Sequence, residues 1–248
     1  CLSRGLGDVY KRQGKWAGVF QFTEKGAQDF CVRAKPRSII DLSAITSIYR
    51  PGPLSAGVDK SYVKAKENPS DIKYLNDVVK RVTKETYGFL IFQEQIALLV
   101  HELGENISLD DGNLLRKLLT KKGTNKDKDE KKKNEIYNKF VKGCTSKNID
   151  IEMANKLWQI CEYFSGYGFN KSHAVSYSIL SYQCAWLLNY YPAEWIAAFL
   201  DKEPEGRKEK AIGIAKRIGF KIKPLDVNYS GEVWEISDDG STLIQPLT

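Results

Sequence analysis

The sequence predicts a mainly α-helical protein, in which a multi-helix domain is followed by the start of a small mixed α/β domain. Through the middle of the chain, apolar residues recur roughly every three to four positions, which is the period of an amphipathic helix. Near the C-terminus the pattern changes to alternating apolar and polar residues around Asp239-Gly240, which is typical of a β-hairpin.

The helical period is interrupted by clusters of glycine, proline or polar residues. Helices are predicted within residues 72–82, 92–103, 114–119, 136–141, 153–164 and 173–190. Loops are predicted at residues 50–53, 86–88, 123–133 and 165–171. Pro192 suits the first turn of a further helix over residues 193–200, and a short helix follows at residues 210–218.

These patterns divide the chain into three segments. Residues 1–15 show neither period and contain no signal-peptide core, so we expect a non-native or disordered lead-in. Residues 16–203 form the helical domain, and residues 204–248 begin the small mixed domain. The only methionine is Met153, and the C-terminal hairpin has no partner strand after it, so we expect a fragment that is cut at both ends.

Composition limits the classes of partner. A net charge of +7 and an isoelectric point near 9.0 favour a polyanionic partner, although many basic proteins bind no nucleic acid. No apolar run reaches the roughly 18 residues of a membrane span, so we expect no membrane partner. The five cysteines include no Cys-x-x-Cys pair, which argues against zinc. A chain of this length does not need disulfides, so we expect reduced thiols and a cytoplasmic location.

A basic helix is predicted to begin at Leu109, because Ser108 and Asp111 fit a capping box with aspartate in place of glutamate. Its leucines gather on one face, and its basic residues, among them Lys117 and Lys121 one turn apart, fall on the other. Like charges at this spacing repel, and a bound polyphosphate or DNA strand would offset the repulsion. A solvated face is the alternative. The run 121–133 is predicted to be a flexible loop or a loose contact to DNA backbone.

A glycine–aromatic loop, GYGFNKSH at residues 166–173, joins two apolar helices. Its glycines allow backbone conformations that other residues avoid. Ser172 or Asn170 is expected to cap the next helix, whose free N–H groups would favour an anion beside Lys171. The two aromatic rings of the loop could stack on a base. His173 is either a phosphate donor or a helix–helix contact, so the residues alone leave a structural role open.

Several stretches stand in the order found in one known family. They are GVFQF at 18–22, YRPGPL at 49–54, ETYGFLIFQEQI at 85–96, LLRKLLTKK at 114–122, GYGFNKSHAVSYSILSYQ at 166–183, YYPAEW at 190–195 and IKPLDVN at 222–228. With these stretches the chain resembles the C family of bacterial replicative DNA polymerases, which contains the alpha subunit of DNA polymerase III.

The resemblance implies a function for each segment. Residues 16–203 would be the fingers domain of a DNA-directed DNA polymerase, which closes over the incoming nucleoside triphosphate. Residues 204–248 would begin the domain that carries a helix-hairpin-helix element and binds the sliding clamp. The implied nucleotide-binding residues are Arg116, Lys117, Lys121, Lys122, Asn170, Lys171 and His173. The implied DNA-binding residues, in template-side or supporting positions, are Arg50, Gln93, Gln95 and Tyr167.

One position departs from the family's pattern. The family usually has two arginines where this chain has Arg116-Lys117. Lysine keeps the charge but loses the bidentate fork, so triphosphate binding should survive with lower affinity.

The resemblance also implies what this chain does not supply. In the family, acidic residues of a palm domain hold the Mg²⁺ ions of nucleotidyl transfer. No Asp-x-Asp lies on a predicted strand, since Asp110-Asp111 is explained by helix capping and Asp238-Asp239 by the hairpin turn. We therefore expect no catalytic residue and no metal site here, a palm upstream of Gly18, and a chain that is inactive alone.

The implied partners are primer–template DNA, a deoxynucleoside triphosphate (dNTP), and the sliding clamp with other replisome subunits. Two alternatives stay open at this point. One is an error-prone translesion paralogue in the same family, and the other is a non-catalytic helical DNA-binding module.

Overall fold

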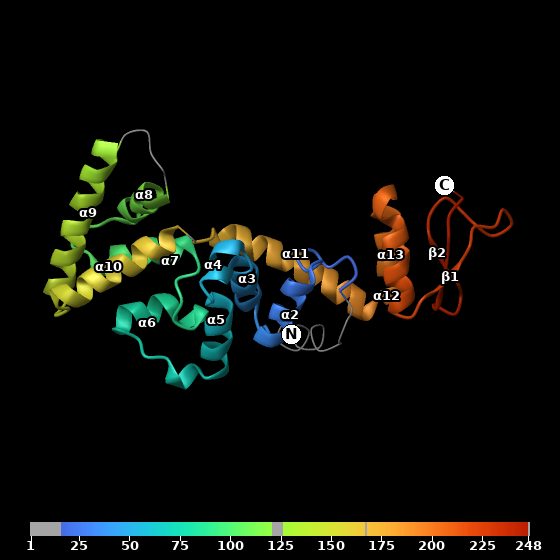
Figure 1. The fold of residues 1–248 in the computed structure, drawn as a ribbon, viewed down its shortest axis with the longest axis horizontal. Helices are drawn as coiled ribbons and strands as arrows, with labels where there is room; N and C mark the ends of the chain where they lie inside the picture. The colour runs from blue at the N-terminus through green and yellow to red at the C-terminus, as the bar shows by residue number, and fades with distance from the viewer. Residues whose placement is uncertain (1–15, 121–125, 167, 248) are drawn as a thin grey trace. The chain divides into compact units, whose positions relative to one another are not determined.

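The computed structural model describes residues 16–120, 126–166 and 168–247 (Figure 1). Most of these residues are helical, and their strands form one small sheet near the C-terminus, so the predicted mainly α fold with a small mixed α/β part is confirmed. The chain divides into two compact units, one of Cys1–Ile39 with Tyr177–Thr248 and one of Ile40–Ser176. The predicted boundary near residue 204 stays a prediction.

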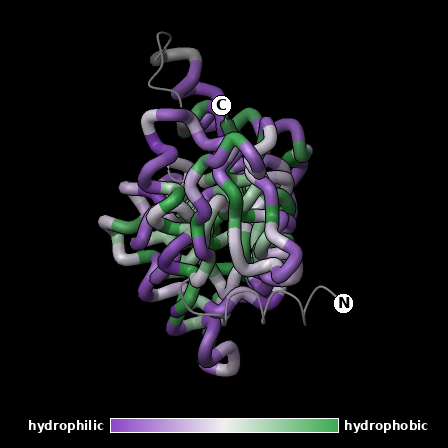
Figure 2. The backbone as a smooth tube through the Cα atoms, turned by 90° about the vertical axis from the view of Figure 1, so that its right-hand side faces the viewer, coloured by the Kyte–Doolittle hydropathy of each residue, from purple (hydrophilic) through white to green (hydrophobic). Residues whose placement is uncertain are grey.

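The unit Ile40–Ser176 is built from helices. In chain order they are α3 (Ile39–Ile48), α4 (Pro51–Ser55), α5 (Val58–Glu67), η1 (Pro69–Asp71), α6 (Asp77–Thr83), η2 (Lys84–Thr86), α7 (Gln93–Leu103), α8 (Leu109–Thr120), α9 (Lys126–Ser146), α10 (Ile151–Ser165) and the first residues of α11 (Lys171–Tyr190). Hydrophobic and hydrophilic residues alternate along the chain (Figure 2), as expected when each helix buries one face.

The core of this unit lies between α7, α8, α9 and α10. Ile96 and Val100 of α7 pack in one cluster with Leu115 of α8 and Phe140 of α9, and all four are fully buried. Helices α7 and α8 approach closely because Gly112 has no side chain, and a Cβ there would lie 2.6 Å from the carbonyl oxygen of Ala97. This close crossing fixes α8 against α7.

The predicted capping box at the start of α8 is confirmed. The backbone N–H and hydroxyl of Ser108 donate to Asp111 Oδ2 at 2.9 and 2.8 Å, and the N–H of Asp111 donates to Ser108 Oγ at 3.1 Å. The N–H of Ser108 is the main reason why the pKa of the Asp111 carboxyl lies below its usual value.

A buried ion pair joins α3 and α5 in the same unit. Lys66 Nζ lies 2.7 Å from Asp41 Oδ2, and the two side chains are only 7% and 4% exposed. The hydroxyl of Tyr87 donates to Asp41 Oδ1 at 3.1 Å. Burial, and then the Asp41 charge, raises the pKa of the neighbouring Tyr62 hydroxyl. Because the pair is buried, removal of either charge alone would leave the other uncompensated.

The second unit contains α2 (Lys25–Ala34), the rest of α11, α12 (Pro192–Lys202), α13 (Glu205–Arg217) and the strands β1 (Lys221–Lys223), β2 (Glu235–Ile236) and β3 (Thr242–Ile244). Strand β3 is central, parallel to β1 and antiparallel to β2. Trp195 of α12 donates its indole N–H to the carbonyl oxygen of Ala17 at 2.8 Å, which attaches the first described residues to α12.

The structure corrects several predicted elements. Residues 50–53 are not a loop, because Pro51 begins the short helix α4. Residues 126–133 belong to α9, since lysine and glutamate are good helix formers and the helix is anchored further on by buried Phe140. The segment 72–82 is helical only from Asp77, where Asn76 caps α6. The C-terminal hairpin also pairs with a strand that precedes it in the chain, because β3 is parallel to β1.

Two further findings concern membranes and thiols. Among the described residues, no helix is long and apolar enough to cross a membrane.

Cys31, Cys144, Cys161 and Cys184 are free thiols, and burial raises the pKa of Cys144 to about 11 and that of Cys161 to about 12. These two cysteines therefore stay protonated at neutral pH.

The capping box gives a prediction for stability. Ser108→Ala should lower the free energy of unfolding by about 1 kcal/mol at neutral pH, because α8 loses its N-cap. Asp111→Asn should also destabilise the chain, and this effect should disappear as the pH falls through the lowered folded pKa of Asp111, since stability from a depressed carboxyl exists only above that pKa.

Urea unfolding at several pH values measures both effects. Asp110→Asn is the matched control, because Asp110 is an exposed carboxylate of the same turn outside the capping box. Equal losses for Asp110→Asn and Asp111→Asn would contradict the capping role.

Candidate functional site

The glycine–aromatic loop is held against the start of α7 by backbone hydrogen bonds. The N–H of Phe169 donates to the carbonyl oxygen of Ile91 at 3.0 Å, and the N–H of Gln93 donates to the carbonyl oxygen of Phe169 at 2.9 Å. These bonds form an isolated parallel β-bridge between Phe92 and Phe169. Two segments far apart in the sequence are therefore joined directly through their backbones.

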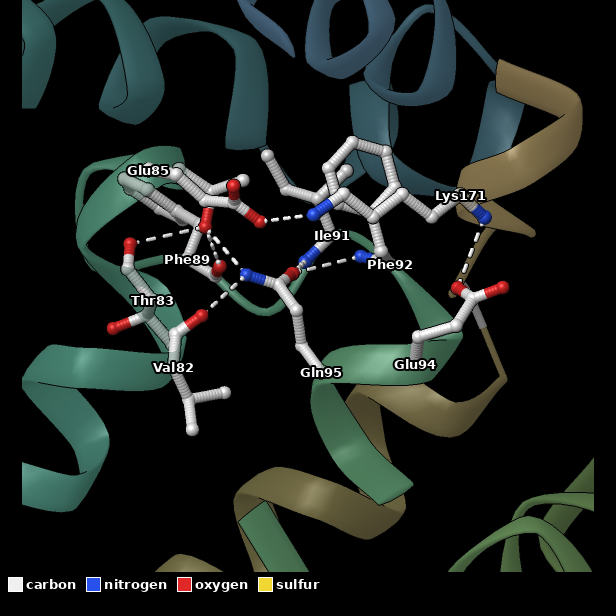
Figure 3. A network of polar contacts seen from close by, with 10 residues as sticks. Val82, Thr83, Glu85, Phe89, Ile91, Phe92, Glu94, Gln95 and Lys171 are labelled. Atoms are coloured by element: carbon white, nitrogen blue, oxygen red, sulfur yellow. Dashed lines mark hydrogen bonds and ion pairs between the residues drawn. The ribbon is translucent and has the colours of Figure 1, made fainter. Parts of the chain in front are cut away.

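Gln95 organises the segment that forms this bridge (Figure 3). Its side-chain oxygen accepts from the N–H groups of Ile91 and Phe92, each at 2.9 Å. Its side-chain nitrogen donates to the carbonyl oxygen of Val82 at 3.0 Å and to Thr86 Oγ1 at 2.8 Å. Gln95 is 4% exposed, so its amide is used inside the protein. The sequence left open whether Gln95 contacts the template or supports the residues that do, and a buried side chain fits the supporting position.

Gln93 connects the loop to the basic helix α8. Its side-chain nitrogen donates to the carbonyl oxygen of Gly168 at 3.0 Å, and its side-chain oxygen accepts from the guanidinium of Arg116. A Cβ at Gly168 would lie 3.0 Å from Gln93 Cγ. Glycine thus allows a tight contact at this position, and the φ of Gly168 is not in the left-handed region.

Asn170 caps helix α11, which was one of the two predicted caps. Its side-chain oxygen accepts from the N–H of His173 at 2.8 Å, and its side-chain nitrogen donates to Glu94 Oε1 at 2.9 Å. The N–H of Lys171 donates to Glu94 Oε2 at 2.9 Å. The expectation of a free anion site at this terminus is therefore wrong, because Glu94 supplies the anion.

The ammonium group of Lys171 also has a partner. It forms an ion pair with Glu85 Oε1, and both side chains are about one third exposed, at 31% and 37%. Figure 3 shows Lys171 between the two glutamates, with its backbone toward Glu94 and its side chain toward Glu85. The loop thus carries a cation that is already neutralised within the fold.

Arg50 and His173 flank the ring of Phe169. The guanidinium carbon of Arg50 lies 4.8 Å from the Phe169 ring centre, and Arg50 Nε donates to the carbonyl oxygen of Ser47 at 2.9 Å. Burial lowers the pKa of Arg50, although arginine remains charged. The imidazole centre of His173 lies 5.5 Å from the Phe169 ring centre, and His173 is exposed.

The structure brings most of the predicted site residues into one connected group. The group consists of Arg50, Gln93, Arg116, Asn170, Lys171 and His173. Gln93 contacts Arg116 and Gly168, Phe169 contacts Arg50 and His173, and Glu94 contacts Asn170 and Lys171. We call this group the loop cluster. Lys117 is exposed on α8 next to Arg116. Lys121, Lys122 and Tyr167 lie outside the described residues.

Glu85 is the member of the site that sequence reasoning missed. It pairs with Lys171 across a large sequence separation, and a lone glutamate near a predicted loop gives no local signal for such a pair. The loop cluster combines guanidinium and ammonium groups with side-chain amides, which can donate to phosphate oxygens and base edges, while Glu85 and Glu94 offset part of its positive charge. Among the described residues, no group of three His, Cys, Asp or Glu side chains is placed to hold a metal ion.

Comparison with known proteins identifies the family. The family model of the bacterial DNA polymerase III alpha subunit finger domain matches residues 9–148, which is more than half of the chain. The chain belongs to this family. The match includes α7, α8 and Arg50, while Asn170, Lys171 and His173 lie beyond it.

Individual relatives extend the similarity to nearly the whole chain. The chain is 32% identical to the DNA polymerase III subunit alpha of Pasteurella multocida over 92% of its own length and 20% of that protein. It is 36% identical to the corresponding protein of Borreliella burgdorferi, over 92% of the chain and 19% of that protein. It is 35% identical to the corresponding protein of Aquifex aeolicus, over 90% of the chain and 19% of that protein. The chain thus spans about a fifth of the length of these relatives.

The Gln95 network predicts a large loss of stability on substitution. Gln95→Met keeps the side chain's length but leaves two buried N–H groups and two acceptors without their partner, so the free energy of unfolding should fall by about 3 kcal/mol or more. Gln95→Glu should also destabilise the chain, because it keeps the acceptor for both N–H groups but buries a carboxylate that faces the carbonyl oxygen of Val82.

Urea unfolding followed by circular dichroism measures these losses. Gln183→Met is the matched control, since Gln183 is exposed on α11 and should change stability by less than about 0.5 kcal/mol. A loss for Gln95→Met as small as that of the control would show that the network does not hold the loop.

Proposed function

We propose that this chain is the fingers part of a DNA-directed DNA polymerase and that the loop cluster binds the incoming nucleotide and the template DNA. The observation that carries the proposal is the chain of contacts from Arg116 through Gln93 to Gly168. It places the basic face of α8 beside the loop that holds Asn170, Lys171 and His173. Membership of the finger-domain family supports the same assignment.

Helix α8 is the proposed triphosphate surface. Arg116 is half-buried and oriented by Gln93, while Lys117 is exposed beside it. A guanidinium held in place loses less freedom on binding a phosphate than a freely moving one, which favours affinity. Lys121 and Lys122 extend the row in sequence. The capping box and the close packing at Gly112 keep this helix in position.

The loop contributes the ammonium group of Lys171, for which the triphosphate would compete with the carboxylate of Glu85. Lys171 is paired with Glu85, and its N–H donates to Glu94. A triphosphate near Lys171 would replace Glu85 as its partner, while Glu94 keeps the end of α11 fixed. We therefore propose that Glu85 holds Lys171 until the nucleotide arrives, at a cost in affinity. Exchange of one anion for another avoids leaving a partly buried ammonium uncompensated.

The template side of the cluster is assigned to Arg50 and Gln93, with Gln95 in support. Arg50 stacks on Phe169 and donates to the carbonyl oxygen of Ser47, which holds its guanidinium beside the loop, and we assign this group to a phosphate or a base edge of the template. Tyr167 is proposed to stack on a base. The proposed partners are therefore a dNTP and primer–template DNA, with the sliding clamp and other replisome subunits as partners of the longer protein.

The described residues do not fit a pair of catalytic metal ions. We propose that acidic residues elsewhere in the longer polymerase hold Mg²⁺, and that this chain orients the nucleotide and the template.

The first test is enzymatic. The purified 248-residue chain, given Mg²⁺, primer–template and all four dNTPs, should extend no primer. Extension by this chain would contradict the proposed division of labour.

The second test concerns Arg116. Arg116→Ala should weaken the binding of a dNTP to the chain by about tenfold, because one charge-assisted hydrogen bond to a phosphate is lost. DNA affinity should change little. In the longer polymerase the same substitution should raise KM for dNTP or lower kcat.

Isothermal titration with dATP measures the binding. Arg81→Ala is the matched control, because Arg81 is an exposed arginine of the same unit that pairs with Glu102. Unchanged dATP affinity in Arg116→Ala, or an equal loss in Arg81→Ala, would refute the role given to Arg116.

The third test asks whether Glu85 restrains Lys171 from binding the nucleotide or positions it for binding. Glu85→Gln should raise dATP affinity a few-fold, because Lys171 is released for the triphosphate. Glu102→Gln, which breaks an ion pair elsewhere in the same unit, should have no effect. A lower dATP affinity in Glu85→Gln would mean that Glu85 positions Lys171 for binding instead of restraining it.

A further inference from the structure

A second basic site lies in the other unit, within a cavity of about 410 Å³ between residues 16–28 and helices α12 and α13. Its cationic wall consists of Arg207, Lys210 and Arg217, all on α13 and all exposed. The loop cluster contributes no residue to it. This α13 groove has the volume of a small-molecule pocket, for which about 300–1,000 Å³ is typical.

The three cations lie on one side of their helix. Positions 207, 210 and 217 are separated by three and seven residues, which returns each side chain to the same face of an α-helix. Ile214 lies between them on that face and also lines the groove. At a rise of about 1.5 Å per residue, the row is about 15 Å long. A row of this length faces several successive phosphates more naturally than a single one.

Two aromatic residues also line the groove, and we call them its aromatic wall. Trp16 and Phe199 both line it, and both are half-buried, so part of each ring faces the groove. Gly18 lets the backbone meet the Phe199 ring closely, because a Cβ at Gly18 would lie 2.8 Å from Phe199 Cδ2. Gly18 has a φ of +69°, which glycine adopts readily. The indole N–H of Trp195 holds Ala17 in place beneath this wall.

The carboxylate of Glu203 offsets part of the positive charge of the α13 groove. Glu203 lines the groove and lies 3.4 Å from Arg207 Nε. The Arg207 side chain in this pair is 70% exposed, so the pair is weakly held and a phosphate can compete for the guanidinium. Lys210 and Arg217 lie on the same wall. The groove therefore remains net positive.

We propose that the α13 groove binds single-stranded DNA, with phosphates along Arg207, Lys210 and Arg217 and a base against Trp16 and Phe199. A cationic track beside aromatic rings is the general arrangement for binding a single strand without reading its sequence. A duplex keeps its bases stacked inside and has none to offer to the aromatic wall. This proposal goes beyond the nucleotide site on α8 and does not depend on it.

The test is the binding of a fluorescein-labelled oligo-dT to the 248-residue chain, followed by fluorescence anisotropy at several salt concentrations. Arg207→Ala with Lys210→Ala should weaken binding about tenfold at 0.05–0.1 M salt, and the salt slope should fall by about 1.4, since each lost phosphate contact on a single strand contributes about 0.7. Lys208→Ala with Lys216→Ala is the matched control. It removes the same charge from the same helix outside the groove and should leave both values nearly unchanged.

A second variant tests the aromatic wall separately. Trp16→Leu should weaken binding about tenfold without changing the salt slope, because stacking involves no counterion release. Circular dichroism and thermal unfolding confirm that each variant is folded. A charge-preserving pair, Arg207→Lys with Arg217→Lys, should retain most of the affinity.

Three outcomes would overturn the proposal. One is an equal loss of affinity in the groove variant and its control, which would show general electrostatic attraction. Another is displacement of the oligonucleotide by stoichiometric free dATP, which would indicate a mononucleotide site. The third is tighter binding of duplex DNA than of single-stranded DNA of equal length, if the Trp16→Leu variant shows the same preference.

Discussion

The arrangement of the candidate site depends on the side-chain amide of Gln95. This one group satisfies two backbone N–H groups at the start of α7 and two acceptors in the preceding segment. It thereby shapes the strand-like stretch at Ile91 and Phe92, onto which Phe169 forms its bridge. Because the amide is buried, each of these groups would otherwise lose water without gaining a partner. The loop, the cap of α11 and the contact to Arg116 all follow from this stretch.

The charges around the loop are balanced inside the protein before any ligand binds. Glu94 occupies the end of α11, and Glu85 pairs with Lys171. A helix terminus that looks open to phosphate in the sequence is thus closed by a carboxylate from a neighbouring helix. The balance moves the proposed triphosphate contact toward Arg116 and Lys117 on α8, and it makes the affinity of the site depend on how readily Glu85 gives up Lys171.

Helix caps and helix starts could be predicted from the sequence, because they depend on residues close together in the chain. The cap at Ser108 and Asp111, the start of α8, the helix after Pro192 and the cap at Asn170 are set by neighbouring residues, and each lies where the sequence predicts it. The charged run before Ile136 was not predicted to be helical, because its stabilising contacts come from the buried residues that follow it in α9.

Long-range pairing could not be predicted from the same rules. Glu85 with Lys171, Gln93 with Gly168, and β3 with β1 are each separated by segments whose folding decides whether they meet. The α13 groove shows the same limit. Its basic row can be found by helical spacing, whereas its aromatic wall joins Phe199 of α12 to Trp16 from the other end of the chain.

Hydrogen–deuterium exchange of the 248-residue chain, with and without saturating dATP, tests the central claim most directly. The account predicts slower exchange in residues 114–119 of α8 and in residues 168–173, joined through Gln93, and little change in α13. Protection that leaves both of these segments unaffected while another part of the chain responds would contradict the assignment of the nucleotide to the loop cluster.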